Sequence, residues 1–227
     1  MFRTPRLAAI LLSIYSCWSF SEPLKIQLTH QGQLQSAPGA VIWLRATKPN
    51  GAVSEEGGKL TEQAASTAHI IEQRDRQFSP YISVTQVGRD IQFPNRDNTA
   101  HHVYSFSEPL SFELPLFKKR TPAPIRVEKP GLIALGCNIH DWMIAYLVVV
   151  DSPFYGQLHN QVVEFAGLPH GEYQALLWHP DINSAQVLKT QLNYQGQKQF
   201  QWPIPQKINA KAQIKAPVER LDEDDDY

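Results

Sequence analysis

The chain has 227 residues, of which 42% are hydrophobic, 10% aromatic and 19% charged. Its 21 Lys and Arg residues nearly balance its 22 Asp and Glu residues, giving a formal net charge of -1. This composition excludes a disordered chain, and the charge balance argues against a nucleic-acid partner. The length suits one ordinary domain with a smaller module, or one extended all-β unit.

The N-terminus has the pattern of an export signal. Two arginines precede the apolar run 7–15, which is too short to anchor a protein across a bilayer, and small residues precede a cut ahead of Glu22. A second possibility is a lipoprotein site, which would leave Cys17 as a lipidated terminus. Either way the sequence predicts an exported, periplasmic protein. No later run of about 18 apolar residues predicts a transmembrane span.

Strand patterns dominate the rest of the chain. Short apolar or alternating runs recur between clusters of Gly, Pro, Asn and Asp, and the chain contains 17 prolines and 12 glycines. Between Gly58 and Gln73 the clustered Ala and Glu suit either a helix or a flexible connection. The pattern predicts an all-β sandwich or barrel, with strands near 25–29, 41–44, 81–85, 91–93, 103–106, 131–135, 144–150, 162–165 and 175–178.

These runs divide the chain into five parts. After the signal peptide, residues 1–21, we expect an N-terminal β segment and linker over 22–72 and a compact central domain over 73–151. A second β unit over 152–205 follows, and the N-terminal strands are candidates to pair with it. The last part, residues 206–227, is a polar linker ending in five consecutive acids, a pattern typical of a solvated tail.

The sulfur-containing side chains lie close together in the sequence. Once the signal and the initiator methionine are set aside, Cys137 is the one remaining cysteine and Met143 the one remaining methionine. An exported protein with a single cysteine has no internal disulfide. The six-residue separation of these two sulfurs therefore directs attention to the segment that joins them.

That segment reads Cys-x-x-His-x-x-Met, formed by Cys137, His140 and Met143. It lies between two strand patterns, so a tight loop brings a thiolate, an imidazole and a thioether together. Thiolate and thioether are soft donors that favour copper, especially Cu(I). Copper would need a second imidazole, and the pair His101-His102 opens a strand upstream. Adjacent strand residues point to opposite faces, so one of the two histidines is expected to bind.

The stretch from about Gln73 to Asp151 resembles a cupredoxin, the blue-copper fold of plastocyanin and amicyanin, and its short ligand loop is most similar to that of amicyanin. The resemblance implies a Greek-key sandwich with one type 1 copper ion, held in plane by His101, Cys137 and His140 and axially by Met143. It implies electron transfer with periplasmic redox partner proteins, in which the electron leaves by the edge of His140 near Trp142. His102 stays the alternative to His101.

The wider resemblance is to exported proteins described as methylamine-utilization or plastocyanin-like. In these proteins a small carboxypeptidase-regulatory-like β-sandwich follows the copper domain, and the segments 168–173 and 178–180 are similar to that unit. Asn95 and Asn138 are expected to tie the two ligand loops together.

Other chemistries fit the sequence less well. Zinc accepts Cys and His but gains little from a thioether, haem c attachment needs a second cysteine, and no nucleophile-elbow motif predicts a hydrolase. We therefore expect a protein that is not an enzyme. Three roles remain open: electron transfer, copper storage or delivery including a purely structural copper, and an accessory role for another exported protein.

Overall fold

The computed structural model describes residues 22–47, 68–182, 186–209, 213 and 215. The predicted signal with Cys17, most of the stretch 58–73 and the acidic run near the end lie outside the described residues. The described residues contain strands β1 to β18 and no α-helix, so the predicted all-β class is confirmed. Among these residues there is also no helix long and apolar enough to span a membrane.

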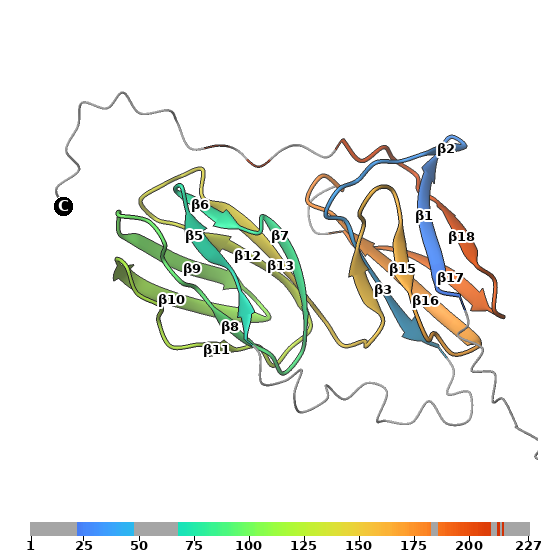
Figure 1. The fold of residues 1–227 in the computed structure, drawn as a ribbon, viewed down its shortest axis with the longest axis horizontal. Coiled ribbons are helices and arrows are strands. Elements are labelled where there is room, and N and C mark those ends of the chain that lie inside the picture. Colours follow the sequence, from blue (N-terminus) through green and yellow to red (C-terminus); the bar gives the residue numbers. More distant parts are fainter. Residues whose placement is uncertain (1–21, 48–67, 183–185, 210–212, 214, 216–227) are drawn as a thin grey trace, which may run out of the picture.

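Ten consecutive strands, β4 to β13, form what we call the central sandwich (Figure 1). One layer is a five-stranded sheet in the order β10 (Leu110–Phe117), β9 (His101–Ser107), β12 (Gly131–Gly136), β13 (Ile144–Val150) and β7 (Ile82–Gln86). The other layer comprises β11 (Ile125–Arg126), β8 (Asp90–Gln92) and β4 (His69–Ile70), with the hairpin of β5 (Glu72–Arg74) and β6 (Gln77–Ser79) beside it.

The strands on either side of this block form the composite sandwich. One sheet contains β15 (Val163–Phe165), β1 (Leu24–His30) and β18 (Gln199–Pro203), with β2 (Gln33–Leu34) added to β1. The other contains β14 (Tyr155–Gln157), β3 (Val41–Ala46), β16 (Gly171–Trp178) and β17 (Leu188–Tyr194). The expected pairing of the N-terminal strands with the C-terminal unit is present: β1 pairs with β15 and β18, and β3 with β14 and β16.

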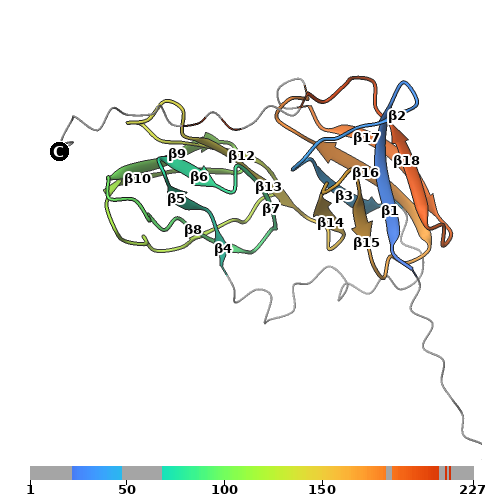
Figure 2. The ribbon, with the colours of Figure 1, turned by 45° about the horizontal axis from the view of Figure 1, so that its top comes forward.

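The continuous apolar runs are strands buried on both faces, because the two sandwiches pack side by side (Figures 1 and 2). On β3, Ile42 and Leu44 enter the composite core, whereas Val41 and Trp43 join a third apolar cluster between the sandwiches. On β13, Leu147 and Val149 enter the central core, and Val148 and Val150 join that same third cluster. Because successive side chains of a strand point to opposite faces, each of these strands contributes to two apolar clusters.

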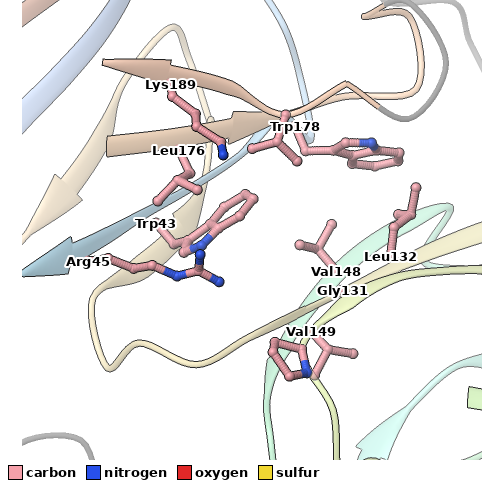
Figure 3. Close-up of a pocket in the computed structure, with 11 residues that line it drawn as sticks. Trp43, Arg45, Gly131, Leu132, Val148, Val149, Leu176, Trp178 and Lys189 are labelled. Atoms are coloured by element: carbon pink, nitrogen blue, oxygen red, sulfur yellow. The ribbon is translucent and has the colours of Figure 1, made fainter. Parts of the chain in front are cut away.

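A groove of about 200 Å3 remains where the two sandwiches meet. Figure 3 shows Trp43, Leu176 and Trp178 of the composite sandwich on one side and Leu132 and Val148 of the central sandwich on the other. The Arg45 guanidinium, on the composite side, bonds through Nε to Asp151 Oδ1 at 2.7 Å, just past the end of β13. The contact between the sandwiches is therefore mainly apolar, with an ion pair at its rim.

The helix considered for 58–73 is absent from the part of that stretch that the structure describes. Residues 69–70 form β4, parallel to β8, and residues 72–74 form β5, antiparallel to β6. The buried Gln73 explains the preference for extended structure, because its backbone N–H donates to Pro94 O at 2.9 Å and its side chain to Phe93 O at 3.0 Å. Tertiary hydrogen bonds override the weak helical pattern here.

Candidate metal centre

His101 is the first residue of β9, and its side chain is fully buried. The burial of β9 alternates, so His101, Val103 and Ser105 face the core, whereas His102 faces outward. His102 Nε2 lies 2.9 Å from the exposed carboxylate of Glu113 on β10, away from the cysteine. The structure therefore resolves the ambiguity between the neighbouring histidines in favour of His101.

Cys137, His140 and Met143 lie in the seven-residue loop that joins β12 to β13. The strands pair up to Gly136 and Ile144, and the loop closes through the bond from Cys137 N–H to Met143 O at 3.2 Å. A second bond, from Met143 N–H to His140 O at 2.9 Å, turns the chain inside the loop. The pairing of β12 with β13 and these two bonds hold the three side chains at one end of the sandwich.

Gly136, immediately before the cysteine, is required by close packing. The ring of Tyr104 on β9 lies over it, and a Cβ at this position would come within 2.7 Å of the Tyr104 ring carbon Cζ. Glycine thus lets β12 approach β9, the strand that carries His101, as their pairing at Gly136 and Tyr104 shows. This contact brings the two ligand-bearing segments to the same edge.

Three donor atoms converge at this edge. The His101 Nδ1 and His140 Nδ1 atoms are 3.2 Å apart, and the Cys137 Sγ atom lies 4.0 Å from the first and 3.7 Å from the second. Cys137 and His101 are buried, and His140 is partly exposed. Among the described residues this is the one group of three His, Cys, Asp or Glu side chains arranged to hold a metal ion.

The spacing of the donors fits a single ion. Metal–nitrogen bonds of about 2.05 Å and a metal–sulfur bond of about 2.3 Å are long enough for one ion to bond to all three atoms across these separations. Two imidazoles and one thiolate are the in-plane donors of a type 1 copper site.

Met143 supplies a buried thioether next to this set. It is 1% exposed and belongs to the same apolar cluster as Cys137 in the central sandwich. A thioether is a soft donor that suits copper and adds little for zinc or for oxygen-binding metals. The four residues predicted from the sequence, His101, Cys137, His140 and Met143, therefore form one site whose donor chemistry is that of type 1 copper.

Asp97 fixes the orientation of His101, a role that the sequence reasoning missed. Its Oδ2 atom lies 2.7 Å from His101 Nε2. Because a carboxylate accepts, Nε2 carries the proton and Nδ1 keeps its lone pair directed toward Cys137 and His140. The spacing of four residues between Asp97 and His101 was the available signal, but only the loop geometry places the carboxylate behind the ring.

Burial and hydrogen bonding set the protonation of this pair. Desolvation lowers the pKa of His101 and outweighs the opposing influence of Asp97, so the imidazole is kept neutral as a metal ligand requires. Burial on its own raises the pKa of Asp97, but bonds from the Arg76 backbone, His101 and the Asp75 backbone together bring it below its usual value. The carboxylate is thus held as an anion behind a neutral ring.

The roles expected for Asn95 and Asn138 need correction. Asn95 is buried, but its amide donates to Thr99 O at 2.9 Å and to Phe117 O at 2.8 Å, while its oxygen accepts from Asp97 N–H at 2.8 Å. It therefore shapes the loop before His101 and ties it to β10, not to the cysteine loop. Asn138 is exposed. Trp142 is instead the side chain of the cysteine loop that bonds to another segment, because its Nε1 donates to Arg76 O at 3.0 Å.

The rim of the site is apolar and partly accessible. The Trp142 ring centroid lies 5.2 Å from that of His140, and the neighbouring Ile139 is 47% exposed. His140 is partly exposed and its ring packs against Trp142, whereas His101 is fully buried. Of the two imidazoles, His140 is the one that reaches the surface.

Comparisons with known proteins show similarity in fold at low identity. No family model and no curated protein matches the chain. Among solved structures, a reduced amicyanin variant is 19% identical, with 41% of this chain and 89% of that chain covered and a TM-score of 0.34. A purple cupredoxin from Nitrosopumilus maritimus is 18% identical, with 36% and 99% covered and a TM-score of 0.33.

The copper-containing nitrite reductase of Thermus scotoductus SA-01 is 21% identical, with 37% of this chain covered and a TM-score of 0.35, but the chain spans only 22% of that enzyme. At these values the likeness concerns the β-sandwich alone. The assignment of the metal centre stands on the donor atoms described above.

Proposed function

We propose that this protein is an exported single-electron carrier built around one type 1 copper ion. The observation that carries the proposal is the convergence of His101 Nδ1, His140 Nδ1 and Cys137 Sγ within 4.0 Å of one another. When bound there, copper supplies a one-electron couple between Cu(I) and Cu(II). A trigonal set with a weak axial thioether is acceptable to both oxidation states, so little rearrangement accompanies electron transfer.

Each residue of the chain has a distinct task in this proposal. Cys137 would provide the thiolate that binds copper most strongly, and Met143 would provide a weak thioether contact that helps to set the reduction potential. The Asp97 carboxylate holds His101 in one tautomer through the 2.7 Å bond to Nε2. The buried core around Cys137 and Met143 keeps water from the sulfur atoms.

The surface near His140 is the proposed exit for the electron. Its ring is partly exposed, and Ile139 and Trp142 provide an apolar border against which a redox partner protein can pack. We propose periplasmic redox proteins as partners and no substrate turnover by this chain. The likeness to a nitrite reductase, of which the chain spans only 22%, does not argue for an enzyme.

We also propose that the composite sandwich is a carboxypeptidase-regulatory-like β-sandwich and that it serves as a docking or spacing unit. It has its own apolar core and packs against the central sandwich through the third cluster, which leaves the copper loop at the opposite end of the central sandwich in Figure 1. The periplasmic location, and lipidation at Cys17 as an alternative anchor, are part of this proposal and rest on the sequence of the first 21 residues.

Copper storage or delivery is the second candidate function. It is favoured by the accessible edge of His140, through which a ligand-exchange partner can reach the ion. The two functions separate by electrochemistry on protein loaded with one copper equivalent. A carrier cycles reversibly between Cu(I) and Cu(II) with both forms bound, whereas a storage or delivery protein releases copper on oxidation or passes it to an apo acceptor within minutes.

A further inference from the structure

Both histidines of the metal centre are supported from the same two residues, Asp75 and Arg76, at the turn of the β5–β6 hairpin. On the His101 side the contact runs through Asp97. The Asp75 N–H donates to Asp97 Oδ1 at 2.7 Å and the Arg76 N–H to Asp97 Oδ2 at 2.9 Å, and that carboxylate in turn bonds His101. The turn thus binds the carboxylate with two backbone donors.

On the His140 side the contact runs through Trp142. Its indole N–H donates to Arg76 O at 3.0 Å, and its ring packs against His140 with centroids 5.2 Å apart. Figure 1 shows the hairpin turn beside the loop that joins β12 to β13. One peptide segment therefore contacts the supporting side chain of each histidine ligand, although the two ligand loops are 36 residues apart at Cys137 and His101.

The turn is well fixed, so it can serve as a reference point for both loops. Asp75 and Arg76 both have left-handed backbone conformations, with φ of 53° and 54°, as a tight two-residue hairpin turn demands. The strand before it is bonded in both directions to the His101 loop, through Gln73 N–H to Pro94 O at 2.9 Å and Arg96 N–H to Gln73 O at 2.8 Å.

We propose that the Asp75–Arg76 turn is a positioning element that couples the two histidine ligands and sets the balance between Cu(II) and Cu(I) affinity. This inference rests on the proposed function. The turn holds Asp97 as an anion behind His101, which favours the more highly charged Cu(II). It also holds Trp142 against His140, which limits movement of the accessible ligand when the ion changes charge. Outer residues of this kind typically alter metal affinity by about 10- to 100-fold.

Two conservative variants test the two sides of the turn. Asp97→Asn keeps the size of the side chain but removes its charge, and we expect about tenfold weaker Cu(II) binding with Cu(I) binding little changed. A tenfold fall in the ratio of Cu(II) to Cu(I) affinity raises the one-electron reduction potential by about 59 mV. Trp142→Phe keeps an aromatic ring but removes the N–H. We expect a smaller change in the ratio of Cu(II) to Cu(I) affinity, together with a broader copper EPR spectrum.

Matched controls remove the same chemical groups elsewhere. Asp90→Asn removes a carboxylate on β8 that pairs with Arg126. Trp43→Phe removes an indole N–H that has no hydrogen-bond partner among the described residues. Both controls are expected to change the ratio of Cu(II) to Cu(I) affinity by less than about twofold.

The coupling itself is tested by combining the variants and by measurements without copper. Each variant changes the ratio of Cu(II) to Cu(I) affinity by some factor. If the turn links the loops, the factor measured for the Asp97→Asn/Trp142→Phe double variant differs from the product of the two single factors by at least about twofold. In the apo protein, Asp97→Asn should also speed hydrogen exchange at the Trp142 indole N–H, which no direct contact explains. Multiplicative effects together with unchanged indole exchange would overturn the inference. A wild-type protein that binds no copper would instead defeat the proposed function, whatever the apo exchange shows.

Discussion

The two sandwiches of this protein share an architecture but differ in what closes their cores. The apolar cluster of the composite core consists of aliphatic and aromatic side chains, including Tyr173, Tyr194 and Trp202. The apolar cluster of the central core also contains the sulfur side chains of Cys137 and Met143, and the buried His101 lies beside them. One end of the central core is thus organised around metal donors.

The buried polar side chains of the two sandwiches also differ in what they bond to. Beside the central core, the buried polar residues Gln73, Asn95 and His101 bond to loops that lead to the ligands. In the composite sandwich, the buried Ser152, in the link between β13 and β14, donates to Leu44 O of β3. The three buried polar residues of the central sandwich therefore position a site, whereas Ser152 helps to complete a fold.

The largest expected effect is the loss of copper binding in Cys137→Ser. A hydroxyl is a harder and less acidic donor than a thiol, so we expect the intense thiolate-to-copper absorption to vanish and Cu(I) binding to weaken by several orders of magnitude. The composite sandwich should be untouched, which the near-UV circular dichroism of its tryptophans checks. Unchanged copper retention in this variant would contradict the role of Cys137.

A matched pair of core truncations comes next in size. Leu147→Ala in the central core and Leu177→Ala in the composite core each remove a fully buried side chain. Each should cost about 2–5 kcal/mol of unfolding free energy. Added copper should offset the loss only in Leu147→Ala, because a ligand stabilises the unit that binds it, by about 4 kcal/mol at 1,000 times its Kd.

Chemical denaturation with and without copper measures this difference. Equal stabilisation of both variants by copper would show that the sandwiches unfold as one unit, and the apolar cluster between them, which includes Trp43 and Val148, would be the reason.

The sequence was informative about the site because ligand chemistry is local. Cys137, His140 and Met143 fall within one loop, and period-two alternation placed His101 and His102 on opposite faces of one strand. It was informative about the all-β class for the same reason, since alternation and turn residues are local signals.

What the sequence did not reveal depends on tertiary contacts. Asp97 acts behind His101 only because the turn at Asp75 and Arg76 folds back onto it, and Trp142 bonds that same turn. The weak helical pattern near Gln73 gave way to strands because that residue bonds the backbone of Phe93 and Pro94. The continuous apolar runs of β3 and β13 indicate burial on both faces, but no local pattern identifies the other sandwich as the surface that covers the second face.

The pH dependence of stability offers a third comparison. Burial, and to a lesser extent the nearby Arg89, lowers the pKa of His69 in the central sandwich to about 4 from its usual 6.5. The unfolded chain therefore takes up a proton that the folded chain does not, and stability is lost as pH falls from 6.5 toward 4, by about 3 kcal/mol in all.

Denaturation of apo protein across this pH range tests the effect. His69→Gln should reduce the pH dependence of the central sandwich, where burial also lowers the pKa of His101, and should leave that of the composite sandwich, where burial lowers the pKa of His179. An unchanged slope in His69→Gln would mean that His69 is not the titrating group.

The smallest expected effect concerns the ion pair at the rim between the sandwiches. Arg45 and Asp151 are joined at 2.7 Å, but their side chains are 40% and 44% exposed. Exposed pairs contribute about 0–1 kcal/mol, so Arg45→Met should change unfolding free energy by less than about 1 kcal/mol and that small change should shrink in high salt. A loss above about 2 kcal/mol would show that this contact, not the apolar cluster, holds the sandwiches together.

The most direct test of the central claim is the EPR spectrum of mature wild-type protein loaded with one equivalent of Cu(II). A donor set of His101, Cys137 and His140 with the thioether of Met143 predicts a narrow copper hyperfine splitting, because the unpaired electron would be shared with the thiolate. The wide splitting of a tetragonal nitrogen and oxygen site, or the absence of a bound copper signal in protein that instead retains zinc, would contradict the account.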